Sequence, residues 1–343
     1  MAQVNAENER LKRQYLTYLR EADGKDEKTL DQVAASLRDF EMALNLKHFK
    51  SFHRDWGRKY KTHLEKCRNH RTGDPLSLTT RDARLRTVKA FFKWLAGRPG
   101  FKSRISYDDV DYFNNNAKDA RAAHAARPIA YPSMEQCAHA FRLMPEDTER
   151  QRRDKAIFAL LMLTAARDSA LASLRLAHVD LVEGYIFQDG REVDTKNGKT
   201  IETWFLPVDE MYLDTFASWI TYLREEKLFG PGDAVFPKPD RTLKNGRFNF
   251  ADLSREPYCN GQKINAIIRA AFKTAGLHEF TPHSFRKTLS LYVDKICATR
   301  EEFKAFSQNV GHSREIITVG SYLPISRERQ RELIRKLGRT RAG

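Results

Sequence analysis

Two histidines, an arginine and a tyrosine follow one another in the last third of the chain. They occur as Thr281-Pro282-His283-Ser284-Phe285-Arg286, then Gly311-His312, then Tyr322. Pro282 stands where a helix can begin, because proline suits the first helical position. A phenolic oxygen can attack a phosphodiester while cationic donors neutralise the phosphoryl oxygens. The residue types therefore indicate phosphoryl transfer, which also needs a second arginine, a proton donor and a surface that binds a polyanion.

A second arginine, Arg167, follows a stretch that is apolar on every side. Residues 156–163 are all apolar, which is typical of a helix buried all round. A cation at the end of such a helix is costly to bury unless it meets an anion. That anion is either a neighbouring carboxylate, Asp168 or Asp180, or a phosphate, whose oxygens match the fork of a guanidinium.

A lysine could be the proton donor that phosphoryl transfer needs. Two β-rich runs, 185–187 and 203–206, are separated by Asn197-Gly198, a strong signal for a hairpin turn. Lys196 and Lys199 flank that turn. A lysine beside a hairpin tip either stays solvated or is inserted beside a phosphate.

The polyanion-binding surface is indicated by charge. The chain has 343 residues and a formal net charge of +15, and residues 47–104 hold seventeen Lys and Arg against four acids. Aromatic residues lie among these cations and are expected to be mainly core. A basic block of this kind is typical of a domain that binds the nucleic-acid backbone.

Helical periodicity dominates the basic half of the chain. Apolar residues recur at helical spacing over 7–19, 26–44, 54–69 and 79–97. We expect a four-helix domain over 1–113, although a protein-binding bundle would show the same periodicity. The last of these helices carries a cationic stripe that we predict to bind DNA: Arg81, Arg84, Arg86, Lys89 and Lys93.

The segment 114–131 has almost no large apolar residues and is predicted to be a linker. A second domain over 132–343 would follow, with further helices over 211–228 and 262–275, a polar loop over 238–249 and a tail helix over 326–337. The first residues lack an apolar signal core, and no apolar run reaches eighteen residues, so we expect a cytoplasmic protein. Four scattered cysteines, without a Cys-x-x-Cys pair, are interpreted as reduced thiols.

In this order, Arg167, a hairpin lysine, His283-x-x-Arg286, Gly311-His312 and Tyr322 resemble the tyrosine recombinases, also called phage-integrase-type site-specific recombinases. The resemblance covers about 133–343, and the basic helical half matches the core-binding domain of that family in architecture. It implies a mainly α, two-domain fold, with a SAM-like core-binding domain and an α+β catalytic domain that contains a small antiparallel sheet. It also implies a prokaryotic, phage or mobile-element source and a nucleoid-associated protein.

The resemblance also implies the role of each residue. Tyr322 would form a 3′-phosphotyrosyl intermediate on the way to a Holliday junction, and Arg167 and Arg286 would hold the non-bridging oxygens. His283 would assist proton movement, and His312 would donate to a phosphoryl oxygen. Lys196, preferred over Lys199, would protonate the leaving 5′-oxygen. The family needs neither ATP nor a metal, and acts as a homo-tetramer on two double-stranded DNA sites, from a monomer or weak dimer.

Two departures from the family pattern stand out. Where members commonly carry an acid three positions after the first arginine, this chain has Ala170, so Asp168 or another residue would have to support the site. The step from His312 to Tyr322 is one residue longer than is commonest. Tyr292, the other nearby tyrosine, is expected in the core. Two alternatives remain: a resolvase or topoisomerase-like role with the same chemistry, and a DNA-binding accessory or repressor protein that keeps the fold without strand exchange.

Overall fold

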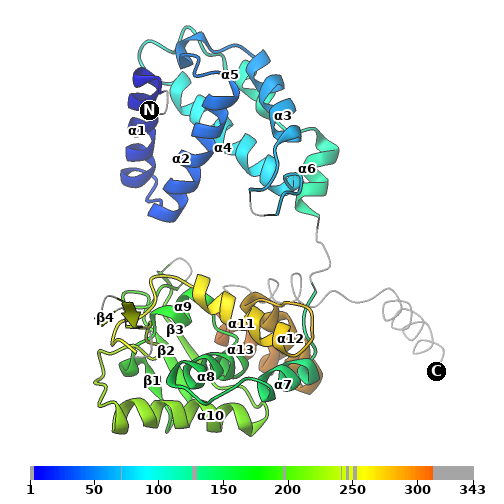
Figure 1. Ribbon diagram of the computed structural model, residues 1–343. Helices are drawn as coiled ribbons and strands as arrows, with labels where there is room; N and C mark the ends of the chain where they lie inside the picture. Colours follow the sequence, from blue (N-terminus) through cyan, green and yellow to red (C-terminus); the bar gives the residue numbers. More distant parts are fainter. Residues whose placement is uncertain are drawn as a thin grey trace, which may run out of the picture. The chain divides into compact units, whose positions relative to one another are not determined.

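The chain forms two compact units, residues 1–127 and 128–343, in a computed structural model (Figure 1). The structure describes residues 4–70, 72–125, 130–195, 198–240, 242–244, 247–249 and 253–311, with the backbone alone for 242–244 and 247–249. Each unit has its own hydrophobic core. None of the described helices is both long enough and apolar enough to span a membrane.

The first unit is helical, as the periodicity predicts. The side chains of Asn5, Asp26 and Ser77 cap the first, second and fourth of its predicted helices. Aromatic residues of the basic block pack edge to face in the core, where Phe49, Phe91 and Phe92 are fully buried. The helices are α1 (Ala6–Glu21), α2 (Glu27–Ala43), α3 (Asp55–Lys66), α4 (Leu78–Ala96), α5 (Tyr107–Val110) and α6 (Ala117–His124).

Helix α6 lies in the segment predicted to be a linker. Asn116 caps its first turn, and the hydroxyl of Thr79 on α4 donates to the carbonyl of Ala123 at 2.9 Å. Ala123 is buried. The alanines of α6 allow close approach to α4 without a large apolar face, which is why composition alone indicated a linker here.

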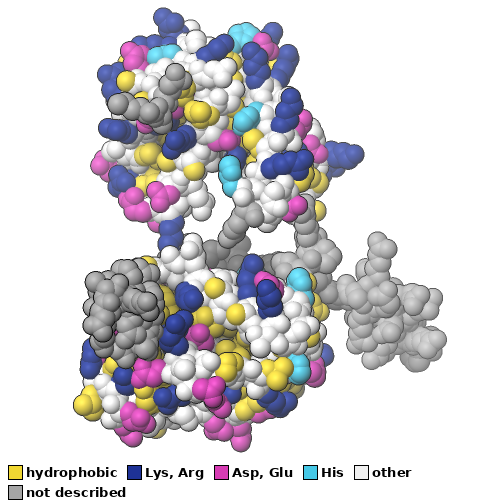
Figure 2. Space-filling view, viewed as in Figure 1, with side chains coloured by type: hydrophobic (Ala, Val, Ile, Leu, Met, Phe, Trp, Pro, Cys, Tyr) yellow, Lys and Arg dark blue, Asp and Glu magenta, His cyan; other side chains and the backbone are white. Residues whose placement is uncertain are grey.

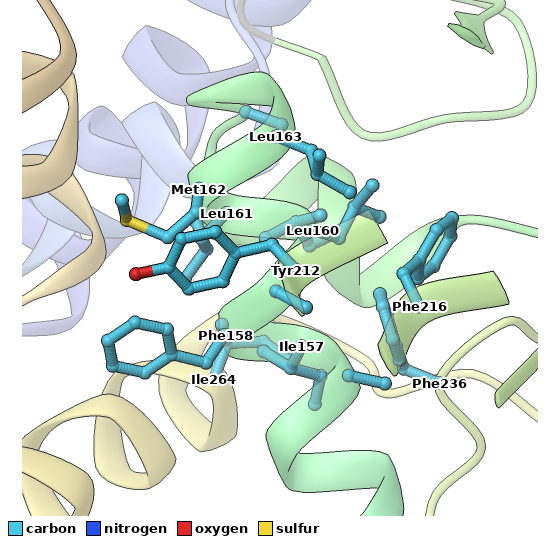
Figure 3. Packing of buried hydrophobic residues seen from close by; sticks show 14 of the residues in the cluster. Ile157, Phe158, Leu160, Leu161, Met162, Leu163, Tyr212, Phe216, Phe236 and Ile264 are labelled. Atoms are coloured by element: carbon cyan, nitrogen blue, oxygen red, sulfur yellow. The ribbon is translucent and has the colours of Figure 1, made fainter. Parts of the chain in front are cut away.

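The second unit is built around α8 (Glu149–Thr164), which is buried along residues 155–164. Figure 3 shows Ile157 and Phe158 of α8 among Tyr212 and Phe216 of α10 and Ile264 of α11. The predicted all-round burial is confirmed. The other helices are α7 (Met134–Arg142), α9 (Asp168–Ser173), α10 (Glu210–Thr221), α11 (Gln262–Thr274), α12 (Pro282–Ile296) and α13 (Arg300–Asn309).

A three-stranded antiparallel sheet accompanies these helices. Its order is β1-β2-β3, with β1 (Val179–Asp180), β2 (Tyr185–Gln188) and β3 (Ile201–Trp204). The predicted pairing of the two β-rich runs is confirmed, since β2 and β3 are antiparallel neighbours. Gln188 pairs with Ile201, so the connection is residues 189–200, longer than a two-residue turn, and residues 196 and 197 within it lie outside the described residues. Within this connection Gly198 has a positive φ, and its N–H donates to the carbonyl of Thr195. The turn signal therefore located a bend inside a longer loop.

The expected polar loop over 238–249 contains a second, short antiparallel pair, β4 (Thr242–Lys244) and β5 (Arg247–Asn249). Polar strand sequences without an apolar alternation carry little β signal, which explains why the pair was missed. Helix α13 was missed as well, although Thr299 and Glu302 form a capping box at its start. That local pattern could have revealed it.

Candidate active site

Arg286 is the central residue of the candidate site. It lies in the first turns of α12, which begins with Pro282 at the first helical position as expected. Its side chain is buried, with 3% exposed. Its Nη1 donates to the carbonyl of Ala165 at 2.6 Å, and its Nη2 donates to the carbonyl of Val310 at 2.5 Å. One guanidinium thus joins the end of α8 to the end of α13.

Ala165, whose carbonyl accepts from Arg286, lies two residues before Arg167, so Arg167 also lies near Arg286. Ala165 ends α8 in the left-handed conformation (φ 49°), and Arg167 then precedes α9 as its N-cap residue. The Arg167 side chain is half-buried, and no described residue forms a hydrogen bond or ion pair with its guanidinium. A guanidinium positioned in this way can bind an anion.

The carboxylates considered as partners for Arg167 have other roles. Asp168 accepts a hydrogen bond from the amide of Asn265 on α11, and its carboxyl packs on Gly261, where a Cβ would lie 2.6 Å from Asp168 Cγ. Asp180 accepts the N–H groups of residues 182 and 183. Asp168 therefore ties α9 to α11 and is not the partner of Arg167 among the described residues. Ala170, where the family acid is expected, is buried.

Gly311, the glycine of the Gly311-His312 pair, lies close to Arg167. It has φ +73°, and a Cβ on it would lie 2.4 Å from Ile201 Cδ1 and 3.9 Å from Arg167 Nη1. The left-handed backbone favours glycine at this position, and a larger residue would also have to displace the end of the Ile201 side chain. The Gly of the Gly-His motif therefore lets the chain pass between β3 and Arg167 just before residue 312.

Asn309 fixes the end of α13 to β3, and sequence patterns did not single it out. The N–H of Trp204 donates to Asn309 Oδ1 at 2.7 Å, and Asn309 Nδ2 donates to the Trp204 carbonyl at 2.9 Å. The hydroxyl of Thr203 also donates to the Asn309 carbonyl at 3.0 Å. The Asn309 side chain thus extends the hydrogen bonding of β3 and sets the position of the residues that follow α13.

We expect Asn309→Ala to slow DNA cleavage more than Gln308→Ala. Loss of the two bonds to Trp204 removes about 1 kcal/mol each of stability and lets the segment after α13 move away from Arg167. Rates of covalent adduct formation and thermal unfolding would be measured together. Asn309→Asp keeps the acceptor for the Trp204 N–H and should be intermediate. Equal rates for Asn309→Ala and Gln308→Ala would refute a positioning role.

His283 and Lys199 occupy different parts of the site. His283 lies at the exposed amino end of α12, one helical turn before Arg286, so both side chains share a face of the helix. Lys199 is half-buried and lines a groove of about 570 Å³ together with Ile201, Asn309 and Gly311. The alternative general acid therefore lies beside the segment that leads to residue 312.

Three of the predicted catalytic residues, Lys196, His312 and Tyr322, lie outside the described residues, as does the predicted tail helix over 326–337. Their roles stay predictions. Tyr292 is half-buried, packs against the core and donates its hydroxyl to the Pro207 carbonyl at 2.6 Å. Tyr292 therefore lies at the edge of the core, and the prediction of a core position is met only in part.

The predicted DNA-binding stripe of α4 is paired with acids or carbonyls. On the face in Figure 2, Lys and Arg of the first unit are interspersed with Asp and Glu. The Arg86 and Lys93 side chains are 63% and 46% exposed, and ion pairs this exposed contribute little and exchange readily. The partners are Leu76 O for Arg81, Asp39 for Arg84, Asp82 for Arg86, and Asp111 for Lys89 and Lys93. DNA binding by the stripe stays a prediction.

Residues 136–296 match the family model described as the phage integrase family. This range contains Arg167, His283 and Arg286. The catalytic domain belongs to the phage integrase family. The chain is therefore a tyrosine-type site-specific recombinase, an enzyme that cuts and rejoins DNA strands, and the expected fold class is confirmed.

Solved structures of recombinases share the fold of this chain at low sequence identity. A lambda integrase dimer bound to a COC′ core site is 15% identical with a TM-score of 0.62, covering 92% of this chain and 95% of that chain. The Tn1549 transposon integrase with transposon right end DNA is 16% identical with a TM-score of 0.57, covering 96% of this chain and 99% of that chain. XerH site-specific recombinase on a palindromic difH substrate is 13% identical with a TM-score of 0.60, covering 94% and 82%. No curated protein sequence matches the chain.

Proposed function

We propose that this recombinase cleaves double-stranded DNA with Tyr322 while Arg167 and Arg286 bind the scissile phosphate. The observation that carries the proposal is the pair of hydrogen bonds from Arg286 to the carbonyls of Ala165 and Val310. These bonds draw together Arg167, the amino end of α12 with His283, and the Gly311 segment that leads to His312 and Tyr322. The convergence supports one active site built from segments far apart in the sequence.

In the proposed reaction, the Tyr322 oxygen forms a bond to phosphorus and the bond from phosphorus to the 5′-oxygen breaks. His283 receives or relays the phenolic proton, and Lys196 gives a proton to the leaving 5′-oxygen. Arg167, Arg286 and His312 stabilise the charge that grows on the non-bridging oxygens. The 5′-hydroxyl of a partner strand then attacks the phosphotyrosine, releases Tyr322 and restores a phosphodiester. Phosphodiester energy is conserved at each step, so the chemistry is reversible.

We propose a tetramer on two DNA sites, passing through a Holliday junction. Support comes from two related structures: a lambda integrase dimer bound to a core site and a lambda integrase tetramer bound to a Holliday junction, the latter at 14% identity and a TM-score of 0.59. The first unit, with its stripe Arg81, Arg84, Arg86, Lys89 and Lys93, would hold the DNA backbone. The predicted tail helix would pack on its own domain or on a neighbouring subunit. We further infer a mobile-element origin and action at the nucleoid.

A suicide substrate tests the function. A DNA duplex with a nick next to the cleavage point releases a short fragment on cleavage, so the covalent intermediate cannot religate and accumulates. The full chain should form a protease-sensitive protein–DNA adduct on its cognate site, identified among genomic fragments by footprinting. Sequence-specific binding without an adduct would instead favour an accessory or repressor protein.

The proton donor is tested by a sulfur leaving group. A 5′-phosphorothiolate leaves without a proton, so a variant lacking the general acid regains activity on it. We expect Lys196→Ala to slow cleavage of the ordinary substrate by about 10²-fold or more, with most of the loss recovered on the phosphorothiolate. Lys199→Ala is the matched variant from the same loop. If Lys199→Ala is the one rescued, Lys199, which lines the groove beside Gly311, is the donor.

A further inference from the structure

A cysteine, a histidine and an aspartate meet in the first unit, in a cluster separate from the candidate active site. Asp39 comes from α2, His63 from α3, and Cys67 follows α3 directly as its C-cap residue. One potential ligand atom from each residue lies within 4.8 Å of the other two. His63 and Cys67 are four residues apart, so both project from the same face of the last helical turn. This cluster joins α2 to the end of α3.

The distances suit a single metal ion. His63 Nε2 lies 3.2 Å from Cys67 Sγ and 3.5 Å from Asp39 Oδ1. With Zn–S near 2.3 Å and Zn–N or Zn–O near 2.1 Å, neighbouring ligand atoms of a tetrahedral zinc are separated by about 3.3–3.6 Å. The His63 Nε2–Asp39 Oδ1 edge therefore already has the separation that a tetrahedral ion requires, and the His63 Nε2–Cys67 Sγ edge is shorter than the tetrahedral value by about 0.4 Å, a shift within reach of a side-chain rotation. A single imidazole nitrogen can donate its proton to just one of two partners, whereas an ion between the three groups would satisfy all of them.

The carboxylate and the imidazole are held by residues behind them. Asp39 Oδ2 accepts hydrogen bonds from the Tyr60 hydroxyl at 2.9 Å and from Arg84 Nη1 at 3.0 Å, which leaves Oδ1 on the side of His63. Tyr60 is fully buried, and its ring stacks on the His63 ring at 6.0 Å with an interplanar angle of 14°. Groups that orient ligands in this way are typical of metal sites, where they fix the carboxylate oxygen and the ring that face the ion.

We propose that Asp39 Oδ1, His63 Nε2 and the Cys67 thiolate bind one zinc-type divalent transition metal, with a water in the fourth position. A thiolate and an imidazole select Zn²⁺ or Co²⁺ over Mg²⁺ and Ca²⁺, which prefer sets of oxygen ligands. The thiolate and the carboxylate balance the charge of the ion, and Arg84 stays on the other carboxylate oxygen. The side chains of His63 and Asp39 are 35% and 25% exposed, so an ion can enter from solvent. The metal would clamp α2 to α3 and stabilise the basic unit.

Cobalt provides a direct test on the full chain. After treatment with a chelator, the wild-type protein is titrated with Co²⁺ alone, and we expect thiolate-to-cobalt charge-transfer and d–d bands that saturate at one equivalent. One equivalent of Zn²⁺ should abolish them. Cys67→Ser should lose the charge-transfer band and His63→Gln should lose saturable binding. The matched control variants are Cys259→Ser, an exposed free cysteine, and His53→Gln, an exposed histidine beside Asp55, and both should behave as wild type.

Thermal unfolding gives a second readout that does not depend on recombination. Zn²⁺ should raise the Tm of wild type and of both control variants, because a ligand that binds only the folded state stabilises it. It should leave the Tm of Cys67→Ser and His63→Gln unchanged. Folded wild type without a cobalt–thiolate band, or with a band that survives Cys67→Ser, would show that the three residues form only a hydrogen-bonded network. If Cys67→Ser does not fold, the same measurements on His63→Gln decide between a metal site and a hydrogen-bonded network.

Discussion

Replacing Tyr322 with phenylalanine is expected to abolish the covalent protein–DNA adduct on a nicked suicide substrate. The variant lacks the oxygen that attacks phosphorus, and no other group of the proposed site can form the phosphoester. DNA binding should remain, because the variant keeps the arginines that we propose to bind the phosphate. The adduct would be measured by gel shift under denaturing conditions, and binding by footprinting on the same DNA.

Tyr292→Phe is the matched control for this experiment. Tyr292 is the other tyrosine near the motif, and its hydroxyl donates to the Pro207 carbonyl. Its removal should leave adduct formation at the wild-type level. An adduct that survives Tyr322→Phe and disappears in Tyr292→Phe would overturn the assignment of the nucleophile. Mapping the DNA-linked peptide by mass spectrometry gives the same answer independently.

Arg167→Ala and Arg286→Ala are expected to reduce the rate of DNA cleavage to a similar extent. They should differ in stability, because only Arg286→Ala should lower the free energy of unfolding substantially. Each removes a cationic fork from the phosphate, and the loss of such a donor in a transition state costs about 10²–10³-fold in rate. No described residue pairs with the Arg167 guanidinium, so Arg167→Ala should change the free energy of unfolding by no more than about 0.5 kcal/mol. Arg286→Ala leaves the buried carbonyls of Ala165 and Val310 without their donor, at about 1–3 kcal/mol each.

Rates of adduct formation and denaturant unfolding of the full chain would separate these effects. Arg286→Lys is a useful companion, because one ammonium cannot span two carbonyls and a phosphate in the geometry of a guanidinium. We expect it to regain part of the stability and little of the rate. Equal stability of Arg167→Ala and Arg286→Ala would contradict the framework role of Arg286.

Arg286 thus differs from Arg167 in what it does for the site. Arg286 is buried and joins the two chain segments that lead to other predicted catalytic residues, whereas Arg167 is half-buried at the end of one of them. Asp168, one of the residues considered for support of the site, bonds to Asn265 and so fastens α9 to α11. The position of Arg167 therefore depends on backbone geometry at Ala165 and on the packing of α9, and not on an ion pair with its neighbour.

Local patterns predicted the elements well. Helical spacing over four stretches of the first unit, all-round apolarity of α8 and Pro282 at the start of α12 depend on residues close together in the chain, and all are found in the structure. The predictions that failed concern weak local signals. The alanine-rich α6 was predicted to be linker and the polar strands β4 and β5 were predicted to be loop, whereas the predicted pairing of β2 with β3 is found with a connection longer than a two-residue turn.

By itself, the sequence determined the reaction class and most of the proposed catalytic residues, because the motif order and the residue types are written in the chain. Only the tertiary structure decided how they meet. Arg286 reaches carbonyls that are 121 and 24 residues away, Gly311 lies against Ile201, and Asn309 bonds to Trp204. The cluster of Asp39, His63 and Cys67 likewise arises where α2 packs on α3. Such contacts follow from the packing of whole elements, which no local periodicity specifies.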